Sequence, residues 1–260
     1  MSGRFLQGKV ALITGSTSGI GLGIAQALAQ AGAHIVVNGF GDPAPALTSI
    51  EKTGVLARFV SADMRMSGEI EQMFEVVKQD WGGIDILVNN AGIQHVSPIE
   101  TFPVGQWDDI LAINLSSAFH TTRLALPHMR EKNWGRIINI ASVHGLVASV
   151  QKSAYVAAKH GLIGLTKVTA LETATTGVTC NAICPGWVLT PLVQKQVDAK
   201  AQASQISIEE ATRQLLSEKE PSQQFTTPEE LGAMAVFLCS SAAQNVRGAA
   251  WNMDGGWAAQ

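Results

Sequence analysis

Tyr155 and Lys159 are spaced to form a proton-transfer pair. Tyr155 is the only tyrosine in the 260 residues, and Lys159, four positions later, falls on the same face of a predicted helix. A free tyrosine has a pKa of about 10, and a nearby ammonium group favours the phenolate. A drop of roughly 3 pKa units requires about 4 kcal/mol. The pair therefore predicts a tyrosine base that removes a hydroxyl proton, with Lys159 lowering its pKa.

Ser142 strengthens this interpretation. A YxxxK pair alone is equally consistent with a buried tyrosine and an unrelated surface lysine. Ser142, thirteen residues upstream, ends a predicted strand and offers a hydroxyl to the same reacting oxygen. We therefore expect Ser142 to donate a hydrogen bond to the substrate.

A glycine-rich turn, Thr14–Gly21, joins the first predicted strand to the first predicted helix. Its glycines follow a G-x-x-x-G-x-G spacing, Gly15, Gly19 and Gly21, which differs from the usual G-x-G-x-x-G fingerprint. Glycine lets the backbone approach a pyrophosphate, and the helix N-terminus supplies free N–H donors and a positive dipole. The alternative is a purely structural turn. Its place at the first strand end favours a phosphate site.

Short apolar runs alternate with longer helical stretches. The predicted strands are Lys9–Thr14, His34–Asn38, Leu56–Val60, Asp85–Asn89, Arg136–Ala141, Val178–Cys184 and Ala249–Met253. The predicted helices are Gly19–Ala31, Ala44–Thr53, Gly68–Trp81, Val104–Lys132, Ser153–Thr173 and Pro228–Ser240. This alternation predicts an α/β fold, a doubly wound Rossmann-type parallel sheet with helices on both faces. We expect one domain over 1–260, with a polar helical insertion at 191–225.

In such a sheet, ligands bind beyond the carboxyl ends of the strands. Polar residues and glycines follow the strands at that edge. They are Thr14-Gly15, Asn38-Gly39-Phe40, Asp63, Asn89–Gly92, Ser142 and Pro185-Gly186. The functional edge is therefore the one that also carries Ser142.

Composition excludes several classes of protein. Charged residues make up 15% of the chain and the net charge is −3, which gives no electrostatic case for nucleic acid. No run of about 18 apolar residues occurs, so we expect no membrane span, and the first ten residues lack a signal-peptide core. The three cysteines form no CxxC pair and the histidines no HExxH motif. We expect a cytoplasmic protein whose catalysis needs no metal.

Taken together, these motifs resemble the short-chain dehydrogenase/reductase family over nearly the full length. They are Thr14–Gly21, Asn89-Asn90-Ala91-Gly92, Asn114, Ser142, Tyr155-x-x-x-Lys159 and Pro185-Gly186. The resemblance implies a seven-stranded sheet and hydride transfer with a nicotinamide cofactor. It assigns Asn114 to holding a water for proton relay and Lys159 to the nicotinamide ribose as well. An asparagine inside a predicted helix has poor propensity, which agrees with a special role.

The expected cofactor is NAD. No lysine or arginine lies in Gly15–Gly21 or Asn38–Asp42 to hold a ribose phosphate, although the acidic residue that NAD-preferring relatives often carry after the second strand is also absent. We expect Phe40 against the adenosine and Asp63 at the adenine amino group. The full set of expected cofactor contacts is Gly15, Thr17, Ser18, Gly19, Ile20, Gly21, Phe40, Asp63, Met64, Asn90, Ala91, Gly92, Tyr155, Lys159, Pro185, Gly186, Val188 and Thr190.

The neighbours of the catalytic groups suit a carboxylate substrate. His144 lies two residues after Ser142, Lys152 lies three before Tyr155, and Gln94 follows the Asn-Asn-Ala-Gly-Ile run. Charge-assisted hydrogen bonds from such groups favour an anion. Trp187 and Trp257 are candidates for apolar walls. Each of the five could instead be an ordinary surface or core residue.

The same segments resemble bacterial D-3-hydroxybutyrate dehydrogenases. The matching runs are Gln94-His95, Ala141–Ala148, Lys152–Lys159, Cys184–Trp187 and Leu192–Gln196. The resemblance implies that Gln94, His144, Lys152 and Gln196 bind the carboxylate and that the insertion closes as a lid. Two alternatives stay open: a 3-ketoacyl-thioester or steroid-type reductase that uses NADP, and a non-catalytic NAD-sensing protein. The intact Asn114, Ser142, Tyr155 and Lys159 set disfavours the second.

The low charge also points to self-association. The two longest predicted helices, Val104–Lys132 and Ser153–Thr173, carry more apolar positions than one core contact needs. Examples are Ile113, Ala118, Phe119, Leu162, Ile163 and Val168. Since the family forms tetramers through the corresponding helices, we expect a homotetramer.

Overall fold

The computed structural model describes residues 3–259, and all seven predicted strands are present. They are β1 Val10–Ile13, β2 His34–Val37, β3 Ala57–Phe59, β4 Ile86–Asn89, β5 Gly135–Ile140, β6 Val178–Pro185 and β7 Ala250–Met253. Most of them are buried along their whole length, which explains their apolar sequences without polar alternation.

The strands form one parallel sheet in the order β3-β2-β1-β4-β5-β6-β7. The order reverses direction between β1 and β4, since the chain builds outward first on one side and then on the other. Ligands bind at this switch point in doubly wound sheets. The predicted fold class is confirmed.

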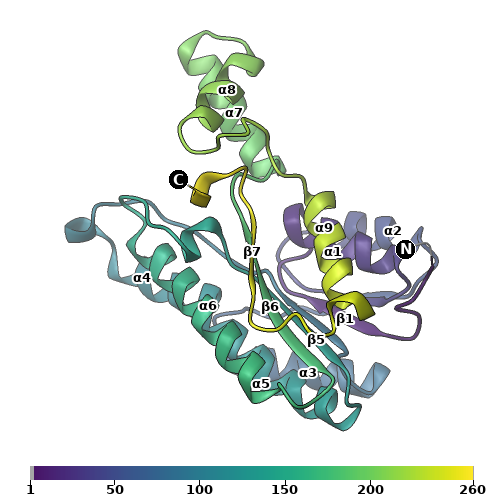
Figure 1. Cartoon of the computed structure of the whole chain (residues 1–260). Coiled ribbons are helices and arrows are strands. Elements are labelled where there is room, and N and C mark those ends of the chain that lie inside the picture. Colours follow the sequence, from purple (N-terminus) through teal and green to yellow (C-terminus); the bar gives the residue numbers. More distant parts are fainter. Residues whose placement is uncertain (1–2, 260) are drawn as a thin grey trace.

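Helices cover both faces of the sheet (Figure 1). One face carries α1 Gly19–Gln30, α2 Ala44–Glu51 and α9 Pro228–Cys239, and the other carries α3 Ser67–Trp81, α4 Val104–Leu111, α5 Ser117–Glu131 and α6 Ser153–Glu172. The short helices η3 Val143–Gly145 and η5 Trp257–Ala259 lie at the carboxyl edge, and η1 Ile99–Thr101 and η4 Ser241–Ala243 complete the connections.

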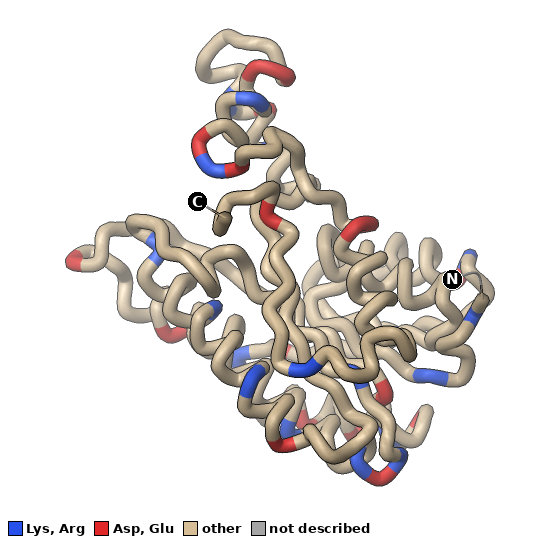
Figure 2. The backbone as a smooth tube through the Cα atoms, in the orientation of Figure 1, with Lys and Arg blue, Asp and Glu red and all other residues tan. Residues whose placement is uncertain are grey.

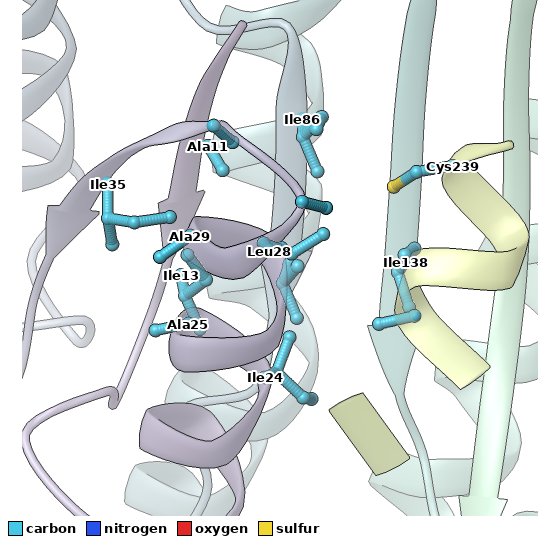
Figure 3. Close-up of a cluster of buried hydrophobic side chains, with 14 of the residues drawn as sticks. Ala11, Ile13, Ile24, Ala25, Leu28, Ala29, Ile35, Ile86, Ile138 and Cys239 are labelled. Atoms are coloured by element: carbon cyan, nitrogen blue, oxygen red, sulfur yellow. The ribbon is translucent and has the colours of Figure 1, made fainter. Parts of the chain in front are cut away.

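The largest core cluster joins the first helical face to the sheet. Figure 3 shows Ile24, Ala25 and Leu28 of α1 beside Ala11 and Ile13 of β1. A second cluster fills the other face with side chains of α3 and α5. Because the sheet is held from both sides, its carboxyl edge is a rigid platform for the site.

The predicted helix Val104–Lys132 is not continuous. A π-turn, η2 Ala112–Ser116, separates α4 from α5, with Asn114 at its centre. The reason is a pair of hydrogen bonds across the site: Ile93 N–H donates to Asn114 Oδ1 and Asn114 Nδ2 donates to the Ile93 carbonyl, both at 2.9 Å. Such turns inside helices often mark functional positions.

The insertion forms two helices, α7 Pro191–Ser204 and α8 Ile208–Ser217, which stand apart from the sheet in Figure 1. The side chain of Thr190 caps α7 and that of Ser207 caps α8. The two helices share a small apolar cluster of their own, built on Val197, Ala201 and Ala211. We call residues 191–225 the lid.

Charges are sparse along the backbone, and both signs occur on the lid (Figure 2). Of the residues expected to form an apolar surface, Ile113, Ala118, Leu162 and Ile163 are instead buried within the subunit, because they face the sheet and neighbouring helices. Within residues 3–259, no helix combines the length and apolar character needed to cross a membrane.

Candidate active site

The carboxyl edge of the sheet gathers most of the predicted site. The glycine-rich turn follows β1, Asn90 to Gly92 follow β4, Ser142 follows β5, and Gly186 follows β6. Strands β1 and β4 flank the switch point. A ligand there would meet polar groups from four neighbouring strands.

The glycine-rich turn is fixed in a form that only glycine accommodates. Gly15 and Gly19 have φ values of +63° and +56°. A methyl group at Gly21 would collide with the Gly15 carbonyl and the Asn90 amide. Asn90 Nδ2 holds the turn by donating to the carbonyls of Thr14 and Gly15, each at 2.9 Å.

The start of α1 is available to an anion. Its N-cap, Ser18, makes no side-chain capping bond, and the first N–H groups of a helix have no partner within it. Thr190, the N-cap of α7, also lies here, since its Cγ2 is 3.5 Å from the position of a Cβ built on Gly19. The turn, the helix start and the lid entrance therefore share one corner, which fits a dinucleotide pyrophosphate.

The end of β2 forms the next part of the edge. Phe40 is 73% exposed and leaves its ring free, while its carbonyl accepts a hydrogen bond from Thr17 Oγ1 at 2.9 Å. The buried Asn38 donates to the carbonyls of Val60 and Ala62 at 3.2 Å. Asn38 was not predicted as a positioning residue, although a buried amide at a strand end was the available signal.

Asp63 follows β3 and is already paired. Arg65 donates to both of its carboxylate oxygens, from Nε to Oδ1 at 3.1 Å and from Nη2 to Oδ2 at 2.6 Å, and this hydrogen bonding lowers the pKa of Asp63. A carboxylate keeps further acceptor positions for an adenine amino group. The side chain of Met64 packs in the core, so only its backbone faces the edge as a possible contact.

Lys159 and Tyr155 project from α6, and Ser142 comes from the end of β5. Lys159 is buried, its Nζ donates to the Ile140 carbonyl at 2.8 Å and lies 5.6 Å from the centre of the Tyr155 ring. Burial lowers the pKa of Lys159 to about 8. The side chains of Lys159 and Tyr155, two of the four predicted catalytic residues, are therefore neighbours in space.

The pKa of Tyr155 moves in the opposite direction to our expectation. Burial raises it, and hydrogen bonding to Ser142 opposes the rise. Lys159 is drawn toward the Ile140 carbonyl, and its own ammonium form is disfavoured by burial. Burial therefore outweighs the Ser142 hydrogen bond in setting the direction of the Tyr155 pKa.

His144, Tyr155 and Trp257 form an aromatic wall. The His144 ring meets Tyr155 edge-on at 5.9 Å and Trp257 at 5.2 Å between centres. Its Nε2 lies 2.9 Å from Ser149 Oγ, and its Nδ1 lies 3.4 Å from Ser142 Oγ. Burial, then the charges of Lys152, Lys219 and His160, lower the pKa of His144 to about 4. His144 is thus a neutral hydrogen-bonding group near pH 7.

Lys152 supplies the positive charge of this wall. It is partly buried, and both burial and the charge of Lys219 lower its pKa. Lys219, in the segment after α8, was not predicted, because nothing in its local sequence separates it from other exposed lysines. The two ammonium groups repel each other beside a neutral imidazole. A carboxylate bound there would offset this repulsion.

The remaining predicted substrate residues are less closely gathered. Gln94 is exposed beyond β4, and Gln196 is exposed on α7. Trp187 is partly buried with its indole Nε1 unpartnered, in the turn after Pro185 and Gly186. Val188, next along, is buried.

Protonation of His144 provides a stability test. Its pKa of about 4, against an ordinary 6.5, means that the unfolded chain binds the extra proton between these values. Stability from this group is complete above pH 6.5 and is lost as the pH falls toward 4, by about 3 kcal/mol. His144→Gln should therefore lose less unfolding free energy between pH 7 and pH 4 than the wild type, measured by chemical denaturation. Parallel curves would contradict the neutral buried imidazole.

Comparison with known proteins identifies the family. The short chain dehydrogenase model matches residues 9–201. The chain belongs to the short-chain dehydrogenase family. This family's fold binds a nicotinamide dinucleotide, and the corner formed by Gly15, Gly21 and the start of α1 fits that group because a side chain at Gly21 would fill the cradle.

Relatives align with nearly the whole chain. The chain is 68% identical over 257 residues to a D-beta-hydroxybutyrate dehydrogenase of Cupriavidus necator, and the alignment covers 98% of this chain and 100% of the relative. It is 53% identical to one of Rhizobium meliloti, covering 97% and 99%. Among short-chain dehydrogenase structures, L-sorbose reductase from Gluconobacter frateurii with NADPH and L-sorbose superposes with a TM-score of 0.93 at 33% identity, covering 98% of each chain.

Proposed function

We propose that this enzyme oxidises D-3-hydroxybutyrate to acetoacetate, reversibly, with NAD. The observation that carries the proposal is the position of His144 beside Tyr155, together with the positive charge of Lys152, which acts on His144 and so favours a carboxylate next to the hydroxyl-handling group. The two relatives at 68% and 53% identity bear the corresponding name. A 3-hydroxy acid has these two groups on neighbouring parts of one small molecule.

Each catalytic side chain has a distinct role in this proposal. Tyr155 removes the hydroxyl proton, and Ser142 donates a hydrogen bond to the oxygen as negative charge develops on it. Lys159 lowers the pKa of Tyr155 and holds the nicotinamide ribose. Asn114, with its amide fixed on Ile93, holds the π-turn in place, so that a water bound at this turn can relay the proton to solvent.

A nicotinamide dinucleotide, when bound, accepts the hydride from the substrate carbon and brings positive charge to the site. Its pyrophosphate would lie on the glycine-rich turn and the start of α1, with Thr190 alongside. The other proposed contacts line the same edge. They are Phe40, Asp63, the backbone of Met64, Asn90, Ala91, Gly92, Pro185, Gly186 and Val188.

The choice of NAD over NADP rests on the surroundings of Phe40. Neither the glycine-rich turn nor Asn38–Asp42 contains a cation, and Arg65, the nearby arginine, is engaged by Asp63 and lies 3.6 Å from Asp109. A phosphate on the adenosine ribose would find no free guanidinium or ammonium there. This supports the proposal of NAD over the reductase alternative, which uses NADP.

The substrate carboxylate would bind Lys152 and His144, with Gln94 at the entrance and Gln196 arriving as the lid closes. Trp187 and Trp257 would flank the methyl end. Closure would exclude water, which strengthens the hydrogen bonds to the carboxylate. The separate apolar cluster of α7 and α8 lets the lid move as one body.

The test is the appearance of NADH absorbance with a panel of hydroxy acids and hydroxyacyl thioesters, each with NAD and with NADP. We expect the highest kcat/KM for D-3-hydroxybutyrate with NAD, about 10-fold or more above NADP, because the ribose phosphate of NADP would lie at this edge without a cation to pair it. Preference for a thioester with NADP would favour a ketoacyl reductase. Binding of NAD without turnover of any substrate would favour a sensor.

We also propose a homotetramer. Phe119 on α5 and Val168 and Leu171 on α6 are 49%, 52% and 77% exposed, and they mark these helices as an association surface. A mass near four times 27.5 kDa in solution at micromolar concentration is the expected result, and a monomer would contradict it.

The three free, buried cysteines suit a reducing compartment, in line with a cytoplasmic protein.

A further inference from the structure

A buried carboxyl group lies at the base of the lid. Glu220 follows α8 and is 1% exposed, although Lys219 and Pro221 on either side of it are exposed. Acidic side chains are almost never fully buried unless they are paired. Its position therefore calls for a reason beyond packing.

Glu220 joins three segments of the chain. Its Oε1 accepts a hydrogen bond from the Trp187 backbone N–H. A methyl group on Gly186 would collide with the same oxygen, and one on Gly255 would lie 3.3 Å from Oε2. Close by, Ser222 N–H donates to the Gly255 carbonyl at 3.0 Å. The carboxyl group is thus wedged between the turn after β6, the end of the lid and the loop after β7.

The other carboxyl oxygen has no partner. Oε2 is buried and makes no hydrogen bond to any of residues 3–259. The nearby Asp254 differs, because its oxygens accept N–H groups of Gly256 at 3.2 Å and Ala258 at 2.9 Å. Donors stabilise a carboxylate, and Oε2 of Glu220 lacks one, so the protonated form of Glu220 is favoured.

The two tryptophans proposed to flank the substrate, Trp187 and Trp257, both connect to this junction. Trp187 is the residue whose N–H binds Glu220, and Trp257 begins η5, which Asp254 caps and which packs on His144 at 5.2 Å. A shift of the Glu220 side chain would therefore move the lid base and the aromatic walls together.

We infer that Glu220 is a positioning residue: its neutral side chain locks the lid base to the turn that carries Trp187 and so sets the walls of the substrate pocket. This inference rests on the proposed function for its kinetic consequence. Ionisation would leave a charged oxygen without a donor beside Asp254, and the lock would loosen.

The charges around Glu220 give the pH range. Asp254 is the charged group that faces Glu220. Lys219 is adjacent to Glu220 in the chain, and its charge lowers the pKa values of His144 and Lys152. Burial first, then Asp254, raise the pKa of Glu220 to about 7 from an ordinary 4.5, against the Trp187 hydrogen bond. Because Glu220 keeps its proton to a higher pH in the folded protein than in the unfolded chain, the free energy of unfolding falls as the pH rises from 4.5 to about 7. This loss is absent below pH 4.5 and complete above about pH 7.

Two variants test the inference in the full-length enzyme. Glu220→Gln keeps the shape but cannot ionise, and Glu220→Ala removes the lock. Ionisation of Glu220 should raise the wild-type KM for 3-hydroxybutyrate about 3-fold between pH 6 and pH 8.5. Glu220→Gln should lack this contribution to the pH dependence of KM. Glu220→Ala should raise KM about 3- to 10-fold at pH 6, the value of one buried hydrogen bond, with kcat changed less.

A thermal measurement separates this inference from the proposed function. Glu220→Gln should melt at least about 3 °C above the wild type at pH 8.5 and close to it at pH 5. Glu218→Gln, an exposed carboxylate of the same segment, is the matched control and should change neither KM nor Tm. If the wild type does not turn over 3-hydroxybutyrate, the proposed function fails and Tm still decides the role of Glu220. A Tm difference independent of pH, or an unchanged KM in Glu220→Ala, would overturn the inference.

Discussion

Replacing Tyr155 with phenylalanine is expected to reduce kcat for hydroxy acid oxidation about 10³-fold or more. The change deletes one oxygen, and general base catalysis by a positioned side chain contributes about 10²- to 10⁴-fold. The ring that packs edge-on against His144 at 5.9 Å is retained, so the fold and the aromatic wall should persist. The rate is measured as NADH production under saturating NAD and substrate.

The control for this variant is cofactor binding. The NADH dissociation constant, followed by fluorescence, should stay within about 3-fold of the wild type, since the lost hydroxyl acts on the substrate and the helix that carries Lys159 is unchanged. Residual turnover above about a tenth of wild type would remove Tyr155 from its proposed role.

The second large effect is expected at Lys152. Lys152→Ala should raise KM for 3-hydroxybutyrate about 10- to 100-fold, because hydrogen bonds to charged groups contribute about 1.5–3 kcal/mol. The dissociation constant for NADH should change little. The loss should also be selective for charge: a neutral ester of the same hydroxy acid should react with both enzymes at similar kcat/KM.

Lys167→Ala is the matched control, since it removes the same charge from an exposed position of the same helix. Fifteen residues of helix, about 22 Å, separate it from Lys152. Its KM should equal that of the wild type. An equal effect of both substitutions would show a general field rather than a specific carboxylate contact.

The sequence predicts the fold well because its signal is local and repeated. Each buried parallel strand is an apolar run bounded by turns, and each helix lies between two such runs, so all seven strands were found within one or two residues. The carboxyl edge follows from topology alone. That is why Gly15, Ser142 and the Tyr155–Lys159 pair could be expected at one place before the structure was known.

What the sequence could not predict depends on contacts between distant segments. The π-turn at Asn114 exists because the amide binds Ile93, 21 residues earlier, and no local propensity encodes that pairing. Burial of Glu220 likewise depends on Gly186 and Gly255, which come from two other loops. The direction of the Tyr155 pKa is set by burial of its side chain, which a spacing of four residues from Lys159 leaves open.

Tyr155 is partly buried, packs edge-on against His144 and is also the only tyrosine of the chain. Tyrosinate absorbs in the near ultraviolet at longer wavelength than tyrosine, and here every such change arises from one residue. The enzyme thus carries an intrinsic optical indicator of its proposed base. Titrating the chain with and without the dinucleotide separates the effect of burial on this ionisation from that of the cofactor, without a label or a substitution.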